Sequence, residues 1–157
     1  MRIILVCVEV ECLLTVDDKI EEIYYNDQAL KIQQDSRRLS RWDLTKSIKF
    51  KSCNKNDPGK LKIKGYDNQD DGENCKTGGL MLLCTDESGG PWQRFKSDNV
   101  HWKDENGDKP CQNEGGFVAY AKKHFKRINF INLMRYWGAK KIWAPRQGVT
   151  LIGGPSP

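Results

Sequence analysis

The stretch "CLLTVDDKIEEIYYND" at residues 12–27 contains two strand patterns that are interrupted by a pair of acids. Leu14 and Val16 lie two positions apart, and alternation of apolar and polar residues is typical of a β-strand with one buried face. Asp17 and Asp18 can accept hydrogen bonds from backbone N–H groups in a turn. A second alternating run, "KIEEIYYN", follows directly. The stretch therefore predicts two consecutive strands joined by a turn, with calcium ligation as the alternative role of the acid pair.

The alternation extends back toward the N-terminus. One face of the first predicted strand carries Ile4, Val6, Val8, Val10, Cys12, Leu14 and Val16. A secretory leader is the alternative, but the apolar run is short, and Glu9 and Glu11 stand where a cleavage site needs small residues. We interpret residues 1–8 as either native strand or the remnant of a leader. If the protein is secreted, we expect its full leader to lie outside this sequence.

Alternation also marks residues 46–66. Ile48 and Phe50 share one face of "LTKSIKFK", with lysines opposite, and Leu61 and Ile63 share one face of "KLKIKGYD". The sequence "NDPG" between them is a turn signal, because proline presets φ and glycine adopts positive φ without strain. This pattern predicts a β-hairpin.

Three more segments indicate strands. "GGLMLLCT" at 78–85 is apolar on both faces and predicts a central strand, while "KKIWAP" at 140–145 and "GVTLIG" at 148–153 predict two others. Residues 117–136 repeat apolar side chains at three- and four-residue steps, which indicates one helix in the C-terminal half. Neighbouring apolar residues dilute that pattern, so a partly extended segment is the alternative.

These elements predict the fold class. About seven short strands, long turn-rich loops and one possible helix argue for a mainly all-β chain, an antiparallel β-sandwich of jelly-roll type. A length of 157 residues favours a single domain over residues 1–157. The turn-rich region at 86–116 is too long for a passive connection and is expected to form a long loop region between strands.

The opening stretch resembles a motif of the form "ITADDxxxLYVNG" that galactose-binding-domain-like sandwiches and anthrax-protective-antigen-type modules carry. The matching residues are Leu14, Thr15, Asp17, Asp18, Ile23, Tyr25 and Asn26, and Asp27 stands where that family usually has glycine. "PGKLKIKGYDN" and "GGLMLLC" resemble later family strands in the same order. The resemblance covers residues 10–85 and implies a galactose-binding-like sandwich. Residues 86–135 depart from it.

Six cysteines are spread widely along the chain: Cys7, Cys12, Cys53, Cys75, Cys84 and Cys111. The lack of close C-x-x-C pairs disfavours a structural zinc site. An even number at wide spacing favours disulfides and a secreted or extracellular protein, with six reduced thiols in a cytosolic protein as the alternative. Six cysteines allow ~15 pairings, so the connectivity is open.

The formal net charge is +5, and no acid follows Glu114, whereas residues 122–146 are rich in lysine and arginine. Such basic areas either attract polyanions or form a solvated face. Nucleic acid is disfavoured as a partner, because the loop tryptophans lie among acids rather than among basic residues. No stretch approaches the ~20 apolar residues of a transmembrane segment.

Two loops carry candidate binding residues. The acidic loop "DNQDDGEN" offers Asp67, Asp70, Asp71 and Glu73 as oxygen ligands for calcium, the one cofactor that the sequence suggests. It is not an EF-hand, because Gly78 stands where the last glutamate is needed. A solvated acidic loop is the alternative.

The second loop, "GGPWQRFKSDNVHW", combines aromatic side chains with hydrogen-bonding groups, as sugar-binding sites do. Its candidate ligand contacts are Trp92, Arg94, Asp98, Asn99, His101 and Trp102. The alternative is that both tryptophans anchor the loop on the sandwich.

Catalysis has little support in the sequence. No nucleophile elbow, zinc-protease helix, phosphate loop or dinucleotide motif is present. The sequence therefore predicts a non-enzymatic extracellular module that binds a carbohydrate or another ligand through its loops. The alternative is a structural or adhesive matrix protein that binds polyanions through a basic face.

Overall fold

The structure is a computed structural model that describes residues 7–17, 19–32, 46–54, 56–66, 79–113, 138–143 and 148–155. Its strands are β1 (Val8–Asp17), β2 (Lys19–Tyr25), β3 (Gln28–Ala29), β4 (Lys46–Ser52), β5 (Leu61–Tyr66), β6 (Gly79–Thr85), β7 (Trp102–Asp104), β8 (Cys111–Asn113), β9 (Lys141–Trp143) and β10 (Gly148–Gly153). No helix occurs in these ranges. The predicted helix at 117–136 lies outside the described residues.

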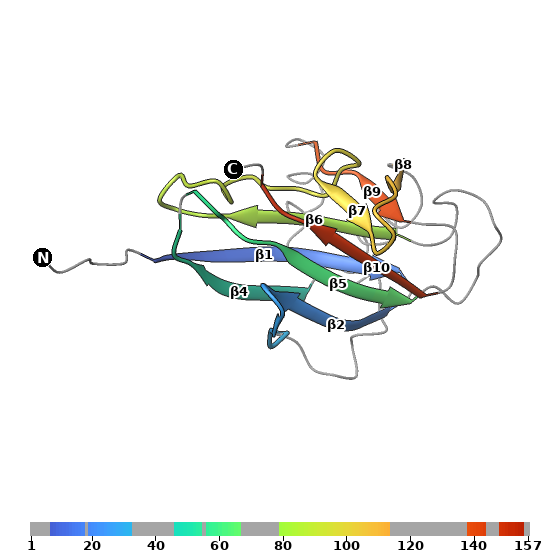
Figure 1. Ribbon diagram of the computed structural model, residues 1–157, viewed down its shortest axis with the longest axis horizontal. Coiled ribbons are helices and arrows are strands. Elements are labelled where there is room, and N and C mark those ends of the chain that lie inside the picture. Colours follow the sequence, from blue (N-terminus) through green and yellow to red (C-terminus); the bar gives the residue numbers. More distant parts are fainter. Residues whose placement is uncertain are drawn as a thin grey trace, which may run out of the picture.

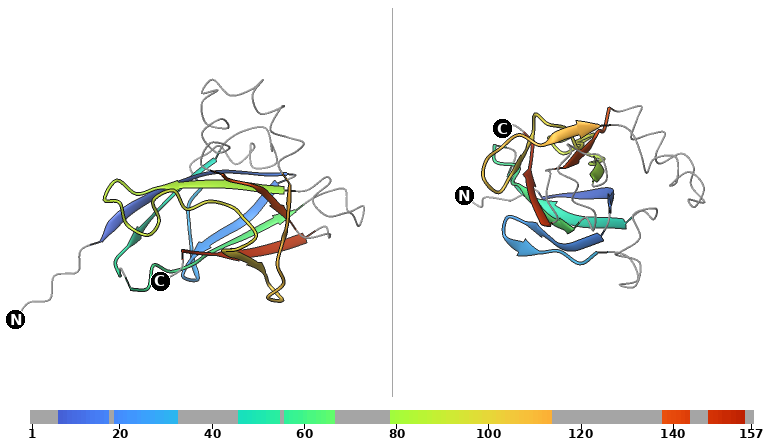
Figure 2. Two further views of the ribbon diagram at one scale, coloured as in Figure 1. Left: turned by 90° about the horizontal axis from the view of Figure 1, so that it is seen from above. Right: turned by 90° about the vertical axis from the view of Figure 1, so that its right-hand side faces the viewer.

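The strands form two five-stranded antiparallel sheets, which face each other as separate layers (Figures 1 and 2). The order in the first sheet, which we call sheet A, is β4-β1-β6-β9-β8, and the order in sheet B is β3-β2-β5-β10-β7. The predicted all-β sandwich is confirmed. No helix in the described part of the chain has the length and apolar character that a membrane span requires.

The core lies between the two sheets, where the alternation places it. Val10, Cys12, Leu14 and Val16 of β1 are fully buried, as the sequence pattern predicts. All of β6 is buried except Thr85, which agrees with the prediction of a central strand. The predicted strands at 19–26, 140–145 and 148–153 are observed as β2, β9 and β10.

The predicted hairpin over residues 46–66 is wrong. β4 pairs with β1 in sheet A, whereas β5 pairs with β2 and β10 in sheet B. Both strands have the predicted apolar face, but they bury it from opposite sides of the core. Within "NDPG", Gly59 has the predicted positive φ (87°), but this stretch lies in a connection that crosses between the sheets.

The strands β1 and β2 also belong to different sheets, although one residue separates them. After β2 the chain turns back into β3 through Asn26 and Asp27, which both have positive φ (47° and 66°). Asparagine and aspartate tolerate this left-handed conformation better than other residues with side chains. Tyr25 packs on the core at the end of β2, with its ring 4.2 Å from that of Phe50.

The region after β6 is more ordered than the long loop that the sequence predicts. It contains two three-residue strands, β7 and β8. Before them, residues 94–97 run along β6 through the hydrogen bonds Cys84 N–Phe95 O (2.8 Å) and Ser97 N–Leu82 O (3.0 Å). This segment therefore continues the edge of sheet A and brings the following loop to the side of sheet B.

Disulfides join neighbouring parts of sheet A. Cys12 of β1 bonds to Cys84, its register partner on β6, and Cys7 bonds to Cys53. Cys111 is also disulfide-bonded. The predicted disulfides at Cys12, Cys53, Cys84 and Cys111 are thus confirmed, and Cys75 lies outside the described residues.

Candidate functional site

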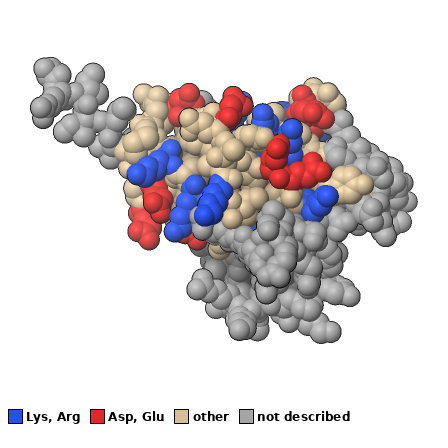
Figure 3. Space-filling view, turned by 90° about the horizontal axis from the view of Figure 1, so that it is seen from below, with Lys and Arg blue, Asp and Glu red and all other residues tan. Residues whose placement is uncertain are grey.

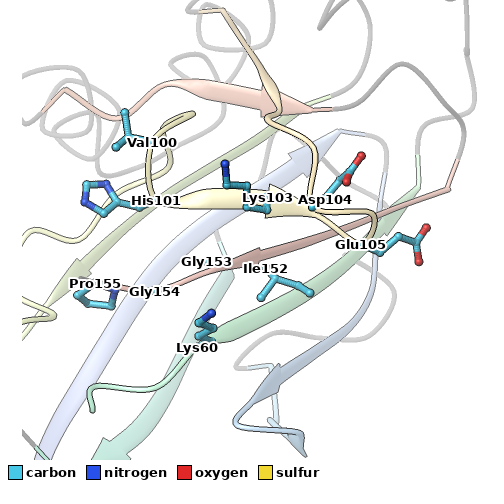
Figure 4. Close-up of a pocket in the computed structure, with 11 residues that line it drawn as sticks. Lys60, Val100, His101, Lys103, Asp104, Glu105, Ile152, Gly153, Gly154 and Pro155 are labelled. Atoms are coloured by element: carbon cyan, nitrogen blue, oxygen red, sulfur yellow. The ribbon is translucent and has the colours of Figure 1, made fainter. Parts of the chain in front are cut away.

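A groove of about 460 Å³ lies on sheet B, where β10 and β7 meet the start of β5 (Figure 4). Its apolar lining comes from Val100, Ile152 and Pro155. Val100 is 69% exposed and is the only large hydrophobic residue among the described ones that is exposed to this degree. Polar groups at the rim come from Lys60, His101, Lys103 and Glu105.

The lysines approach the groove from opposite sides of β10. Lys60 directly precedes β5, and Lys103 lies in β7, on the other flank of β10. Both side chains belong to exposed residues. Among the described residues no ion pair joins either lysine to a carboxylate. Their ammonium groups are therefore available to a ligand.

The position of His101 is set by Asp98, which is 8% exposed. One carboxylate oxygen of Asp98 accepts hydrogen bonds from the backbone N–H groups of Val100 (3.0 Å) and His101 (2.7 Å). The other oxygen lies 2.9 Å from Nδ1 of the imidazole. These bonds hold the imidazole at the rim and leave its Nε2 for a ligand.

The buried acid that lines the groove, Asp104, also accepts hydrogen bonds. Asp104 is 7% exposed, and its Oδ1 accepts hydrogen bonds from the backbone N–H groups of Asn106 (2.8 Å) and Asp108 (2.9 Å). This carboxylate therefore organises the turn after β7. The exposed acid at the rim is Glu105.

Aromatic rings pack below the base of the groove. Trp102 lies against Phe95, with ring centroids 5.7 Å apart, and Phe95 lies 4.9 Å from Trp92. A Cβ atom on Gly153 would overlap the Trp102 ring. Only glycine at that position lets β10 lie so close to the indole.

The two loop tryptophans do not contact a ligand in this arrangement. Trp92 and Trp102 are both fully buried, and their indole N–H groups donate to the carbonyls of Pro58 (2.8 Å) and Lys96 (3.0 Å). Stacking on a sugar needs an exposed ring face. The prediction that Trp92 and Trp102 contact a ligand is therefore wrong for this arrangement. The rings anchor the loop instead, which was the alternative interpretation.

Of the remaining predicted ligand contacts, some lie at the groove and others do not. His101 lines the groove, whereas Asp98 lies outside the lining and holds the His101 ring. Arg94 is exposed with φ 61°, and Asn99 is half-buried, but neither lines the groove. Of the groove residues, Lys60, Lys103 and Ile152 were missed by the sequence analysis. They lie on three different strands or strand ends, and no local motif links them.

The predicted calcium ligands Asp67, Asp70, Asp71 and Glu73 lie outside the described residues. Within the described ranges, no cluster of three or more His, Cys, Asp or Glu side chains has the arrangement of a metal site. The basic stretch at 122–146 also lies largely outside them. On the described part of the face drawn in Figure 3, acidic and basic side chains are intermixed.

A second, smaller cavity of about 290 Å³ is acidic, with Glu9, Glu11, Asp86 and Glu87 in its lining. Lys49 lies 4.0 and 3.8 Å from the carboxylates of Glu9 and Glu11 and partly neutralises them. Asp86 is buried, and its Oδ2 has no hydrogen-bond partner. That oxygen faces Gly90, where a Cβ atom would overlap it.

No family model, no curated protein and no solved structure matches this chain.

Proposed function

We propose that the protein is an extracellular carbohydrate-binding module and that the groove on sheet B holds the glycan. The observation that carries the proposal is a groove whose lining combines the apolar side chains of Val100, Ile152 and Pro155 with the lysines Lys60 and Lys103. A sugar ring offers apolar C–H groups on its faces and hydroxyl groups around its edge. A groove that combines apolar contact with a few fixed polar groups suits such a ligand.

The support beneath the groove favours a binding role. His101 is held by Asp98, so its ring is oriented before the ligand arrives, which lowers the entropy that binding costs. The buried carboxylates of Asp98 and Asp104 accept backbone hydrogen bonds. Because these carboxylates already accept backbone hydrogen bonds within turns, we assign no acid–base catalysis to them.

The resemblance to galactose-binding-like sandwiches and the disulfides support the same proposal. The pairs Cys7–Cys53 and Cys12–Cys84 suit an oxidising environment. Binding of calcium by the acidic loop at 67–74 belongs to the proposal as an additional element.

A glycan array probed with the oxidised protein tests the proposal, with calcium in one set of wells and a chelator in the other. The best hit is then titrated calorimetrically against variants. Val100→Asp and His101→Ala should each weaken binding about tenfold, because they remove groove contacts worth ~1.4 kcal/mol. Lys49→Ala, on the outer face of sheet A, is the matched control and should bind normally.

Two results would contradict the proposal: an array without hits, or hits that both groove variants bind as tightly as the native protein. Loss of the hits in chelator would add the acidic loop to the site.

A further inference from the structure

The outer face of sheet B continues the groove as a row of side chains. The register places Tyr24 of β2 beside Lys62 of β5, Lys62 beside Ile152 of β10, and Ile152 beside Lys103 of β7. Ile152 and Lys103 also line the groove. The row therefore begins inside the groove and crosses β10 and β5 to reach β2.

A second row lies next to the first. It joins Glu22, Lys64 and Thr150, two positions along each strand, and alternation puts these side chains on the same outer face. Lys62 and Lys64 keep 33% and 44% of their side-chain surface exposed. Together with Lys60 and Lys103, they place four lysines around the groove and on the adjoining strands.

Two acids of this surface, Glu22 and Asp27, lie toward the β2–β3 edge, and Glu105 lies at the rim of the groove. Glu22 accepts a 2.6 Å hydrogen bond from the hydroxyl of Tyr24 and lies 3.5 Å from Lys64. Asp27, in the β2–β3 turn, lies 3.4 Å from Lys62. Exposed ion pairs of this kind contribute little to stability. Lys62 and Lys64 can therefore turn from these acids to an external anion at small cost.

We propose that the ligand is an acidic polysaccharide that leaves the groove and crosses the outer face of sheet B along Ile152 and Lys62. This inference rests on the proposed function and adds the charge and the path of the glycan. Neighbouring strands are 4.7–4.9 Å apart, so Lys62 and Lys103 lie about 10 Å apart along the row. Sulfate or carboxylate groups on successive sugars of the chain would meet these lysines in turn.

Calorimetric titration with heparin-derived oligosaccharides tests the path. Lys62→Gln and Lys64→Gln should each weaken binding of an octasaccharide about two- to fivefold, as expected for exposed charge contacts. A disaccharide, too short to leave the groove, should bind both variants like the native protein. Asp27→Asn should strengthen octasaccharide binding, because it releases Lys62. Lys49→Gln removes the same charge from sheet A and should change nothing.

The acid group is identified by a parallel titration with an unsulfated polyuronate of equal length and with neutral maltooctaose. Tighter binding of either acidic chain than of maltooctaose supports the inference and says which acid is preferred. Raising the salt concentration should weaken that binding, because salt screens exposed charges.

The inference and the proposed function fail in different ways. If His101→Ala weakens glycan binding about tenfold while Lys62→Gln and Lys64→Gln bind the octasaccharide normally, the groove is supported as the binding site and the path is overturned. Equal affinity for acidic and neutral chains overturns the charge assignment in the same way. If no oligosaccharide binds at all, both are overturned. Equal urea unfolding midpoints of the variants exclude misfolding as a cause.

Discussion

The indole N–H of Trp92 donates a 2.8 Å hydrogen bond to the carbonyl of Pro58, 34 residues away in the chain. The hydroxyl of Tyr25 donates to the same carbonyl at 2.8 Å. One backbone oxygen thus joins the end of β2, the connection between β4 and β5, and the loop that follows β6. This junction fixes the loop whose far end carries Val100 and His101 to the groove.

Replacing Trp92 should destabilise the protein without acting directly on the ligand. Trp92→Ala should lower the free energy of unfolding by about 3–5 kcal/mol, because a large buried ring is lost. Trp92→Phe keeps most of the packing on Phe50 and Phe95 but loses the hydrogen bond, and we expect a smaller loss of about 1–2 kcal/mol. Urea unfolding followed by circular dichroism measures both. Normal stability of Trp92→Ala together with lost glycan binding would instead return the ring to the binding site.

Gly153→Ala should be destabilising because the new methyl group would overlap the Trp102 ring. Overpacking of this kind costs about 1–3 kcal/mol. Thr150→Ala, on the same strand with its side chain directed outward, should change the unfolding free energy by less than about 0.5 kcal/mol. In a Trp102→Ala background, Gly153→Ala should cost clearly less. An additive double-mutant cycle would show that the contact is not the cause.

Removing the carboxylate of Asp98 should affect both stability and the groove. Asp98→Ala leaves the N–H groups of Val100 and His101 without their acceptor, which should lower stability by about 1–2 kcal/mol. The imidazole loses its orienting partner, so glycan binding should weaken at protein concentrations where the variant is fully folded. Unfolding and calorimetry measure the two effects. Asp108→Ala, an exposed acid in the neighbouring turn, is the control, and an equal effect there would argue against a specific role of Asp98.

The carboxyl of Glu22 should titrate below its ordinary range. The hydrogen bond from Tyr24, and then the charge of Lys64, lower the pKa of Glu22 from its usual value of 4.5, although desolvation opposes them. A lowered pKa stabilises the folded state above pH 4.5, and this contribution is lost as the pH falls through the folded-state pKa. In Tyr24→Phe the pKa of Glu22 should rise. NMR titration of the carboxyl carbon measures it, and unchanged titration would contradict the assigned cause.

The same bond acts on Tyr24 in the opposite direction. The hydrogen bond to Glu22, with some desolvation, raises the pKa of the Tyr24 phenol from its usual value of 10.0. Glu22→Gln should lower that pKa toward the ordinary value, which ultraviolet difference titration against the Tyr24→Phe variant detects.

Loss of the Cys12–Cys84 disulfide should be more costly than loss of Cys7–Cys53. These bonds span 72 and 46 residues of sequence, and loop-closure entropy gives about 4 kcal/mol for each. Cys12 and Cys84 are also fully buried, whereas Cys7 is exposed, so paired alanine substitution removes core contacts only at the first bond. Urea unfolding of the two double variants measures the difference. Equal losses would contradict a packing contribution.

The described strands show which structural features a local sequence pattern can predict. The period of two in β1, β4 and β5 predicts their buried faces correctly, because side chains of an extended chain alternate in direction whatever its neighbours are. Gly59 has the positive φ that the "NDPG" sequence predicts, because glycine adopts it without strain. These are properties of short segments, and they need no knowledge of partners.

The local sequence pattern does not predict which strands pair. The pattern that predicts a hairpin over 46–66 is equally satisfied when β4 and β5 belong to opposite sheets and both bury their apolar faces in the core. The two arrangements differ in long-range ladders: β4 with β1, and β5 with β2 and β10. The same limit explains the tryptophans, since a loop position does not reveal whether a ring is covered by distant residues such as Phe50.

The sequence by itself determined the all-β class, the strand faces, the use of cysteines in disulfides and the positive φ of Gly59, because these follow from side-chain alternation, composition and local φ preference. Only the tertiary structure decided which strands pair, which cysteines bond and where the groove lies. Lys60, His101, Lys103 and Ile152 meet there because β5, β10 and β7 are neighbours in sheet B. That adjacency results from burying two apolar sheet faces against each other, which depends on the whole chain at once.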